Sequence, residues 1–212
     1  MIILSFDCAY RSLAWAYINF SPISEIIADT KKCMKDAIAG DTFAPPPMIQ
    51  LLAGGVDDIL GRPVASVDHV GRARKLHQHL VDLDSRHPTP DLVLIEHQPM
   101  RMGMASNAHS SVVQQQILFH YIAAGIAVEF IDPKQKNNID LSIPMSALME
   151  NAVSSQAKYR ARKKHSIANF DIIAAVFDMK IAVPAKHKDD IADAIMQALV
   201  YWGRYLATTA AA

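Results

Sequence analysis

The pattern of apolar and polar positions predicts alternating strands and helices. Short apolar runs bounded by turn residues are typical of buried strands and occur at residues 1–6, 13–20, 92–95 and 127–131. Apolar residues at helical spacing predict helices at 68–84, at 107–124 and from 189 onward. The first two strands are separated by a tight link, so we expect an antiparallel hairpin. The later strand-helix-strand order indicates parallel pairing and an α/β fold.

The C-terminal stretch 186–202 has two distinct faces when it is read as a helix. One is an apolar stripe made of Ile191, Ile195, Leu199 and Trp202. The other carries Asp190, Asp193 and Gln197. A helix cap explains Asp189, and the helix dipole partly explains Asp190, but neither accounts well for Asp193. We therefore interpret Asp190 and Asp193 as ligands of a divalent metal ion.

Two further acids follow predicted strands. Asp7 ends the first strand, where it shares a face with Ile3 and Ser5, and Glu96 follows the apolar run 92–95. A lone acid in such a place is usually a turn former, but ligands of α/β proteins gather at the carboxyl ends of parallel strands. A buried and unpaired Glu96 would also be costly.

Four converging carboxylates would repel each other strongly without cations among them. Oxygen-only ligation favours Mg²⁺ or Mn²⁺, and two such ions about 4 Å apart form a clamp for attack of water on a phosphodiester. The acids thus predict a site with two metal ions that hydrolyses a phosphodiester bond.

A basic stretch precedes the acidic helix. The predicted DNA-binding residues are Lys158, Tyr159, Arg160, Arg162, Lys163, Lys164 and Lys188. Cations there would neutralise backbone phosphates, and Tyr159 could stack on a base or sugar. The alternative is an ordinary solvated helix face, and Lys188 could equally be a surface charge.

Composition fits one soluble domain. The chain has 212 residues, a formal net charge of zero and two cysteines, so we expect a single domain over 1–212 in a reducing, intracellular setting. No apolar run reaches the ~18 residues of a membrane span. Prolines and the pair Gly54–Gly55 suggest a loop-rich insertion at roughly 31–65, and 140–155 has no clear period and suggests a flexible loop.

Five ordered motifs resemble those of the RuvC-like Holliday junction resolvases, in their poxviral and mitochondrial branch: SFDCAYRSLAWAYI, IEHQPM, EFIDPKQK, KYRARKKHSI and HKDDIADAIMQAL. The resemblance implies a ribonuclease H-like fold, with a mixed five-stranded sheet flanked by helices. It also implies a homodimer that binds four-way DNA junctions and makes symmetric nicks with ligatable 5′-phosphate ends. The four acids match the metal ligands of this family, and Lys158 to Lys164 match its DNA-contacting segment. A viral member would act in the host cytoplasm.

Three other functions stay open at this stage. A ribonuclease H-type nuclease acting on hybrid or other branched substrates would use the same acids. A non-catalytic junction-binding module would bind DNA without magnesium and without nicking. A sugar kinase or actin-like ATPase also begins with a strand, an Asp and a hairpin, but it needs two lobes and glycine-rich phosphate loops, and eight glycines leave little room for them.

Overall fold

The computed structural model describes most of the chain and contains one mixed sheet. The described residues are 1–8, 12–20, 49–59, 69–97, 105–138, 145–150, 152–176 and 187–209. Within them, five strands lie in the order β3-β2-β1-β4-β5. Their bounds are Ile2–Cys8 (β1), Ser12–Phe20 (β2), Ile49–Asp58 (β3), Leu92–Glu96 (β4) and Ala127–Ile131 (β5). The predicted α/β class and the mixed five-stranded sheet are confirmed.

The pairing of the strands determines where the predicted site residues meet. β1 runs antiparallel to β2 and parallel to β4, and β4 is parallel to β5. In the parallel pair, Phe6 lies opposite Ile95, so the next residue on each strand is one of the predicted acids, Asp7 or Glu96. The carboxyl ends of β1, β4 and β5 therefore form one edge of the sheet, where α/β proteins place their ligands.

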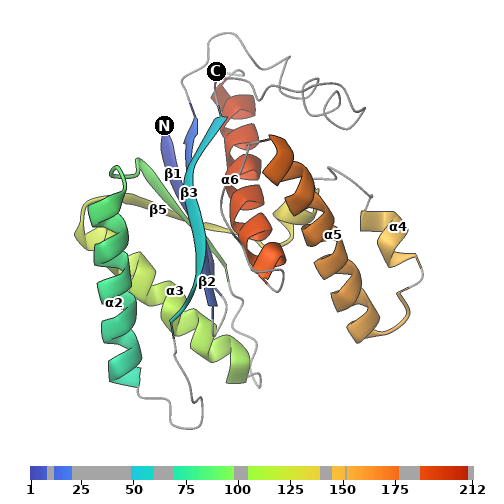
Figure 1. Cartoon of the computed structure of the whole chain (residues 1–212), viewed down its shortest axis with the longest axis horizontal. Helices are drawn as coiled ribbons and strands as arrows, with labels where there is room; N and C mark the ends of the chain where they lie inside the picture. Colours follow the sequence, from blue (N-terminus) through green and yellow to red (C-terminus); the bar gives the residue numbers. More distant parts are fainter. Residues whose placement is uncertain are drawn as a thin grey trace.

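Helices cover both faces of the sheet. Their bounds are His69–Arg86 (α2), Ala105–Ala123 (α3), Gln135–Asn138 (the 3-10 helix η1), Met145–Met149 (α4), Ser155–Val176 (α5) and Lys188–Thr209 (α6). α2 and α3 lie on one side and α6 on the other, with α5 and then α4 beyond α6 (Figure 1). None of the described helices combines the length and apolar character needed to cross a membrane.

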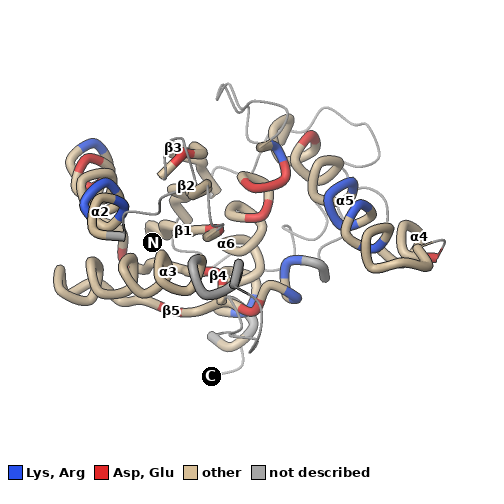
Figure 2. The backbone as a smooth tube through the Cα atoms, turned by 90° about the horizontal axis from the view of Figure 1, so that it is seen from below, with Lys and Arg blue, Asp and Glu red and all other residues tan. Residues whose placement is uncertain are grey.

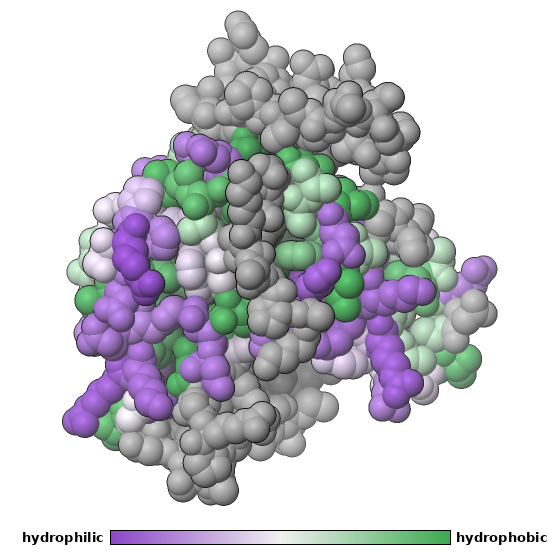
Figure 3. Space-filling model, in the orientation of Figure 1, coloured by the Kyte–Doolittle hydropathy of each residue, from purple (hydrophilic) through white to green (hydrophobic). Residues whose placement is uncertain are grey.

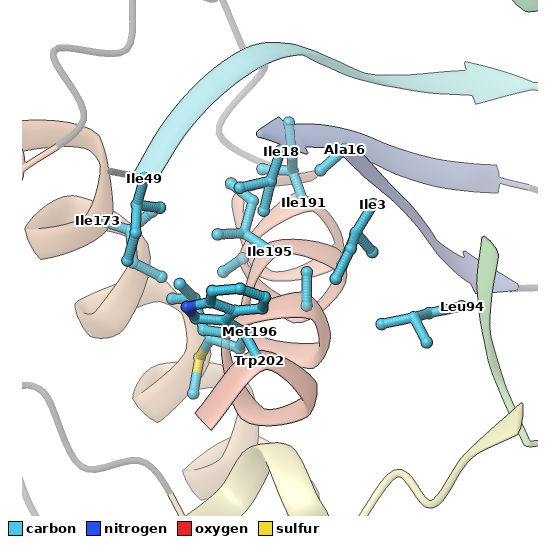
Figure 4. Close-up of a cluster of buried hydrophobic side chains, with 14 of the residues drawn as sticks. Ile3, Ala16, Ile18, Ile49, Leu94, Ile173, Ile191, Ile195, Met196 and Trp202 are labelled. Atoms are coloured by element: carbon cyan, nitrogen blue, oxygen red, sulfur yellow. The ribbon is translucent and has the colours of Figure 1, made fainter. Parts of the chain in front are cut away.

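The core between α6 and the sheet follows the sequence pattern. The predicted stripe is buried, with exposed fractions of at most 7%: Ile191, Ile195, Leu199 and Trp202. It faces Ile3, Ile18 and Leu94 from the sheet (Figure 4). Three alanines of α6 are also fully buried and allow close approach: Ala192, Ala194 and Ala198. Burial of this stripe fixes the opposite, acidic face of α6 relative to the strand ends.

The core on the other face of the sheet is formed by α2 and α3, at the two helices predicted over 68–84 and 107–124. α3 buries Val113, Ile117 and Tyr121, and it is followed by Gly125 with φ 74°. In α2, Val70 and Val81 are 59% and 41% exposed. Three leucines at helical spacing form its buried side: Leu76, Leu80 and Leu83. Leucines bury more apolar area than the shorter valines, so they decide which side of α2 faces the sheet.

Two predicted loops contain regular structure. Gly54 and Gly55 belong to β3, where they pair with Ala16 and Trp15. A Cβ at Gly55 would lie 3.0 Å from the Trp15 ring, so glycine is needed there for the indole rather than for a turn. Residues 49–58 are thus part of the sheet, while 31–48 and 60–65 lie outside the described residues. The predicted loop at 140–155 contains α4, and α5 begins at its last residue.

Candidate active site

Three of the four predicted acids converge at the carboxyl edge of the sheet. Asp7 comes from β1, Glu96 is the last residue of β4, and Asp193 lies in the second turn of α6. The carboxyl group of Asp7 is hydrogen-bonded to that of Glu96 and is close enough to Asp193 to feel its charge. Strand alternation points Asp7 toward α6, because it shares the face of Ile3. Residues from the first, middle and last parts of the chain therefore form one acidic cluster.

A lysine that the sequence reasoning missed lies among these acids. The ammonium of Lys136, on η1, donates hydrogen bonds to Glu96 Oε2 at 2.7 Å and to Asp193 Oδ2 at 2.5 Å. The motif EFIDPKQK contained the signal, since it directly follows β5, the neighbour of β4. Asp132 accepts a bond from the backbone N–H of Lys134 at 2.8 Å, and this turn leads the chain back over the strand ends.

Burial and mutual charge control protonation in the cluster. Burial, and then the charge of Glu96, raise the pKa of Asp7 well above its ordinary value, while Lys136 opposes the shift. Burial also raises the pKa of Asp193, again opposed by Lys136. Burial alone would lower the pKa of Lys136, but the charges of Asp7, Asp193 and Glu96 raise it instead. The lysine is therefore held as a cation, and the cluster favours positive charge at its centre.

Further hydrogen bonds orient two of the carboxylates. The side-chain amide of Gln197 donates to Glu96 Oε2 at 2.9 Å, and Ser5 donates to Gln197 Oε1 at 3.2 Å. The hydroxyl of Ser166, on α5, donates to Asp193 Oδ1 at 2.9 Å. The face of α6 that carries Asp193 and Gln197 is thus polar because it serves the acidic cluster.

Asp190 lies at the same edge but is bonded to other residues. Its Oδ2 is 3.0 Å from His187 Nδ1 and 3.5 Å from the hydroxyl of Ser12, the first residue of β2. Within the described residues its partners are these two side chains rather than Lys136. Neighbouring Asp189 lies within the first turn of α6 rather than at the cap position before it, and its buried carboxylate pairs with Lys163 at 2.6 Å.

The arrangement as it stands does not form a metal centre. In the part of the chain that the structure describes, no group of three or more Asp, Glu, His or Cys side chains is arranged to hold a metal ion. The physical reason is visible in the contacts: the ammonium of Lys136 takes the place of a cation between Glu96 and Asp193. The donors are nevertheless all carboxylate oxygens, which suit Mg²⁺ or Mn²⁺. In their chemistry these carboxylates therefore fit such an ion in place of the Lys136 ammonium.

The predicted DNA-binding residues lie on α5 and at the start of α6. Five of them are exposed: Lys158, Tyr159, Arg160, Arg162 and Lys164. The basic stretch of α5 lies beyond the acidic turns of α6 as seen from the sheet (Figure 2), and hydrophilic side chains gather over α5 in the space-filling view (Figure 3).

The other two predicted cations have partners within the protein. Lys163 pairs with Asp189, and Lys188 pairs with Asp171 at 3.1 Å. The hydrogen bond from Lys163 to Asp189 raises the pKa of this lysine above its ordinary value. The basic stretch therefore contains both exposed cations and cations that join helices.

Comparisons with known proteins agree with this architecture. Residues 141–205 match the family model described as the poxvirus A22 protein. No curated protein sequence matches the chain. Among solved structures, RuvC of Thermus thermophilus is similar with a TM-score of 0.56 and 15% identity, over 99% of this chain and 98% of that chain.

Two resolvase structures are similar as well. The fowlpox virus resolvase, solved with its substrate Holliday junction DNA, has a TM-score of 0.54 and 19% identity, over 97% of this chain and 99% of that chain. The yeast mitochondrial Holliday junction resolvase has a TM-score of 0.53 and 14% identity, over 97% of this chain and 78% of that chain. At such identities the likeness establishes the fold. The chain thus has a RuvC-like fold, and its residues 141–205 match the family model of the poxvirus A22 protein.

Proposed function

We propose that the protein is a metal-dependent DNA endonuclease that resolves Holliday junctions by symmetric nicks. The observation that carries the proposal is the convergence of Asp7, Glu96 and Asp193 around one ammonium group at the carboxyl edge of the sheet. The family match at 141–205 and the likeness to structures solved with Holliday junction DNA support the choice of substrate.

The metal ligands in this proposal are the four predicted acids, Asp7, Glu96, Asp190 and Asp193, and the ions are two Mg²⁺ or Mn²⁺. When bound, such ions activate water and stabilise the charge that develops on the phosphate and its leaving oxygen. Among these acids, Asp190 must turn its carboxylate toward the other three. In this structure that carboxylate is bonded to His187 and Ser12.

The protein's own side chains orient the metal-binding carboxylates and supply positive charge beside them. Gln197 holds Glu96 through Oε2, and Ser166 holds Asp193 through Oδ1. In this proposal the Lys136 ammonium exchanges its carboxylate partners for a non-bridging phosphate oxygen of the bound DNA.

The DNA-contacting surface in this proposal is the exposed side of α5. Lys158, Arg160, Arg162 and Lys164 supply cations for backbone phosphates, and Tyr159, 53% exposed, offers a ring for stacking. Lys163 and Lys188 belong to the same proposed surface, and each also forms an ion pair within the protein.

Symmetric nicking requires two active sites, and we propose that a homodimer supplies them. The outer side of α3 carries three exposed apolar residues at helical spacing: Val112 (42%), Phe119 (66%) and Ile122 (55%). Phe130 on the edge strand β5 is 40% exposed. Apolar area of this kind on α3 and β5 suits a second copy of the chain. The protein would act inside the cell, in the host cytoplasm for a viral source.

A cleavage assay tests the proposal. Synthetic four-way junctions should be nicked symmetrically in Mg²⁺ and left intact in EDTA, and duplexes should be poor substrates. Four variants replace an acid by its amide: Asp7→Asn, Glu96→Gln, Asp190→Asn and Asp193→Asn. Each should still bind junctions but lose more than 100-fold in nicking activity, because loss of an outer-shell partner alone typically costs roughly 10- to 100-fold. Near-normal nicking by any two of them would refute the assignment of the site.

The same assay separates the alternatives. Preferential cleavage of RNA–DNA hybrids would identify a ribonuclease H-type nuclease. Tight junction binding that ignores Mg²⁺, without nicking, would identify a binding module.

A further inference from the structure

Helix α5 touches both the proposed DNA surface and the acidic cluster. Its N-terminal half carries the exposed cations around Arg162, and its C-terminal half packs on α6 through buried Phe170 and Ile173. Between these two parts, the hydroxyl of Ser166 donates a hydrogen bond of 2.9 Å to Asp193 Oδ1. Ser166 follows Arg162 by one helical turn, so the group that holds an acid lies on the same side of α5 as an exposed cation of the proposed DNA surface.

Ser166 binds the oxygen of Asp193 that Lys136 leaves available. Lys136 donates to Oδ2 and Ser166 to Oδ1. A divalent cation that enters between Glu96 and Asp193 competes with the ammonium at Oδ2, but it does not have to displace the hydroxyl at Oδ1. The hydrogen bond from Ser166 can therefore persist in the metal-bound site, as outer-shell contacts to ligating carboxylates do.

A second contact fixes the relative position of the two helices. Lys163, three residues before Ser166, pairs with Asp189, four residues before Asp193, at 2.6 Å. The two links thus join neighbouring turns of α5 to neighbouring turns of α6. The position of α5 consequently determines where the Ser166 hydroxyl lies relative to Asp193.

We propose that Ser166 is a positioning residue, which orients Asp193 for the metal ion and makes the geometry of the acidic site depend on the placement of the DNA-contacting helix α5. This inference rests on the proposed function. Without the hydroxyl, the Asp193 carboxylate can rotate, and a cation must order it on binding. The cost appears as weaker metal binding, while the proposed phosphate contacts of the exposed α5 cations are unchanged.

Three variants test the inference. Ser166→Ala removes the hydroxyl, and Ser166→Thr retains it. Ser85→Ala is the matched control, because the hydroxyl of exposed Ser85 on α2 donates to the backbone carbonyl of Asp82, away from the acidic cluster. The measurements are the Mg²⁺ concentration at half-maximal thermal stabilisation without DNA, the Mg²⁺ concentration at half-maximal nicking, and the affinity for a four-way junction in EDTA. Circular dichroism of each metal-free variant checks the fold.

We expect Ser166→Ala to raise both Mg²⁺ midpoints by at least ~10-fold, the lower end for loss of an outer-shell partner. Its junction affinity in EDTA should equal that of the wild type, Ser166→Thr should recover most of the loss, and Ser85→Ala should match the wild type throughout. Unchanged midpoints in Ser166→Ala overturn the inference, and so does an equal loss in Ser166→Thr. Weaker junction binding in EDTA would assign Ser166 to the DNA surface instead.

The outcomes also separate this inference from the proposed function. A wild-type protein that responds to Mg²⁺, together with an unaffected Ser166→Ala variant, refutes the inference alone. A wild-type protein that neither nicks junctions nor gains thermal stability in Mg²⁺ refutes the proposed function and the inference with it.

Discussion

Replacing Lys136 by methionine should strongly destabilise the metal-free protein. Methionine keeps most of the apolar stem and removes the ammonium that bonds to Glu96 and Asp193. The side chains of Lys136 and Glu96 are only 11% and 9% exposed, so the small energies of surface ion pairs do not apply. Removing one partner of a buried pair typically costs about 3–5 kcal/mol, because it leaves uncompensated charge.

The corresponding thermal shift is easily measured. For a domain of this size, 1 kcal/mol lowers the midpoint of unfolding by roughly 2–4 °C, so the expected loss is ~6–20 °C in EDTA at neutral pH. Mg²⁺ should recover much of it, since a divalent cation replaces the missing charge. Lys134→Met is the matched control, because Lys134 is exposed and only two residues away. Circular dichroism melts of both variants, with and without Mg²⁺, give the comparison.

The pH dependence has a definite sign. Burial raises the folded-state pKa of Asp7 and Asp193 above the ordinary value, so the folded protein holds these protons more tightly than the unfolded chain does. The free energy of unfolding in EDTA therefore decreases as pH rises from the ordinary carboxyl range through the raised pKa values. Without Lys136 the acids repel more strongly, and the destabilisation should be smaller at pH 5 than at pH 7. A variant that melts at the wild-type temperature, or loses more stability at pH 5, would refute this account.

Three other predictions concern charge, DNA binding and assembly. Asp7→Asn should raise the melting temperature in EDTA, because the buried charge beside Glu96 is removed, and should reduce the stabilisation by Mg²⁺; a lower melting temperature in EDTA would contradict this. Lys164→Ala should reduce the salt slope of junction binding by ~1 without changing the melting temperature, whereas Lys163→Ala should lower the melting temperature through loss of the Asp189 pair. An unchanged slope in Lys164→Ala would exclude that lysine from the DNA surface. Phe119→Asp on α3 should convert a dimer to a monomer in light scattering after size exclusion; a persisting dimer would place the interface elsewhere.

The acids of the site were accessible from the sequence because local patterns placed them. Apolar runs predicted β1 and β4, so Asp7 and Glu96 could be assigned to strand ends before any tertiary contact was known. The apolar stripe of α6 likewise fixed the opposite face, with Asp193 and Gln197. Side chains on one face recur about every two residues in a strand and every three to four residues in a helix. These periods follow from backbone geometry alone.

The tertiary structure decided which side chains meet and which partners they choose. Lys136 is 40 residues from Glu96 and 57 from Asp193, and no local period relates residues so far apart. Asp190 and Asp193 share a helix face in sequence, yet their partners differ: His187 for Asp190, Lys136 and Ser166 for Asp193. The sequence alone thus determined where acidic groups would reach the edge of the sheet. Only the packing of η1 and α5 against α6 decided their pairing, because it depends on the distances between elements that the chain brings together on folding.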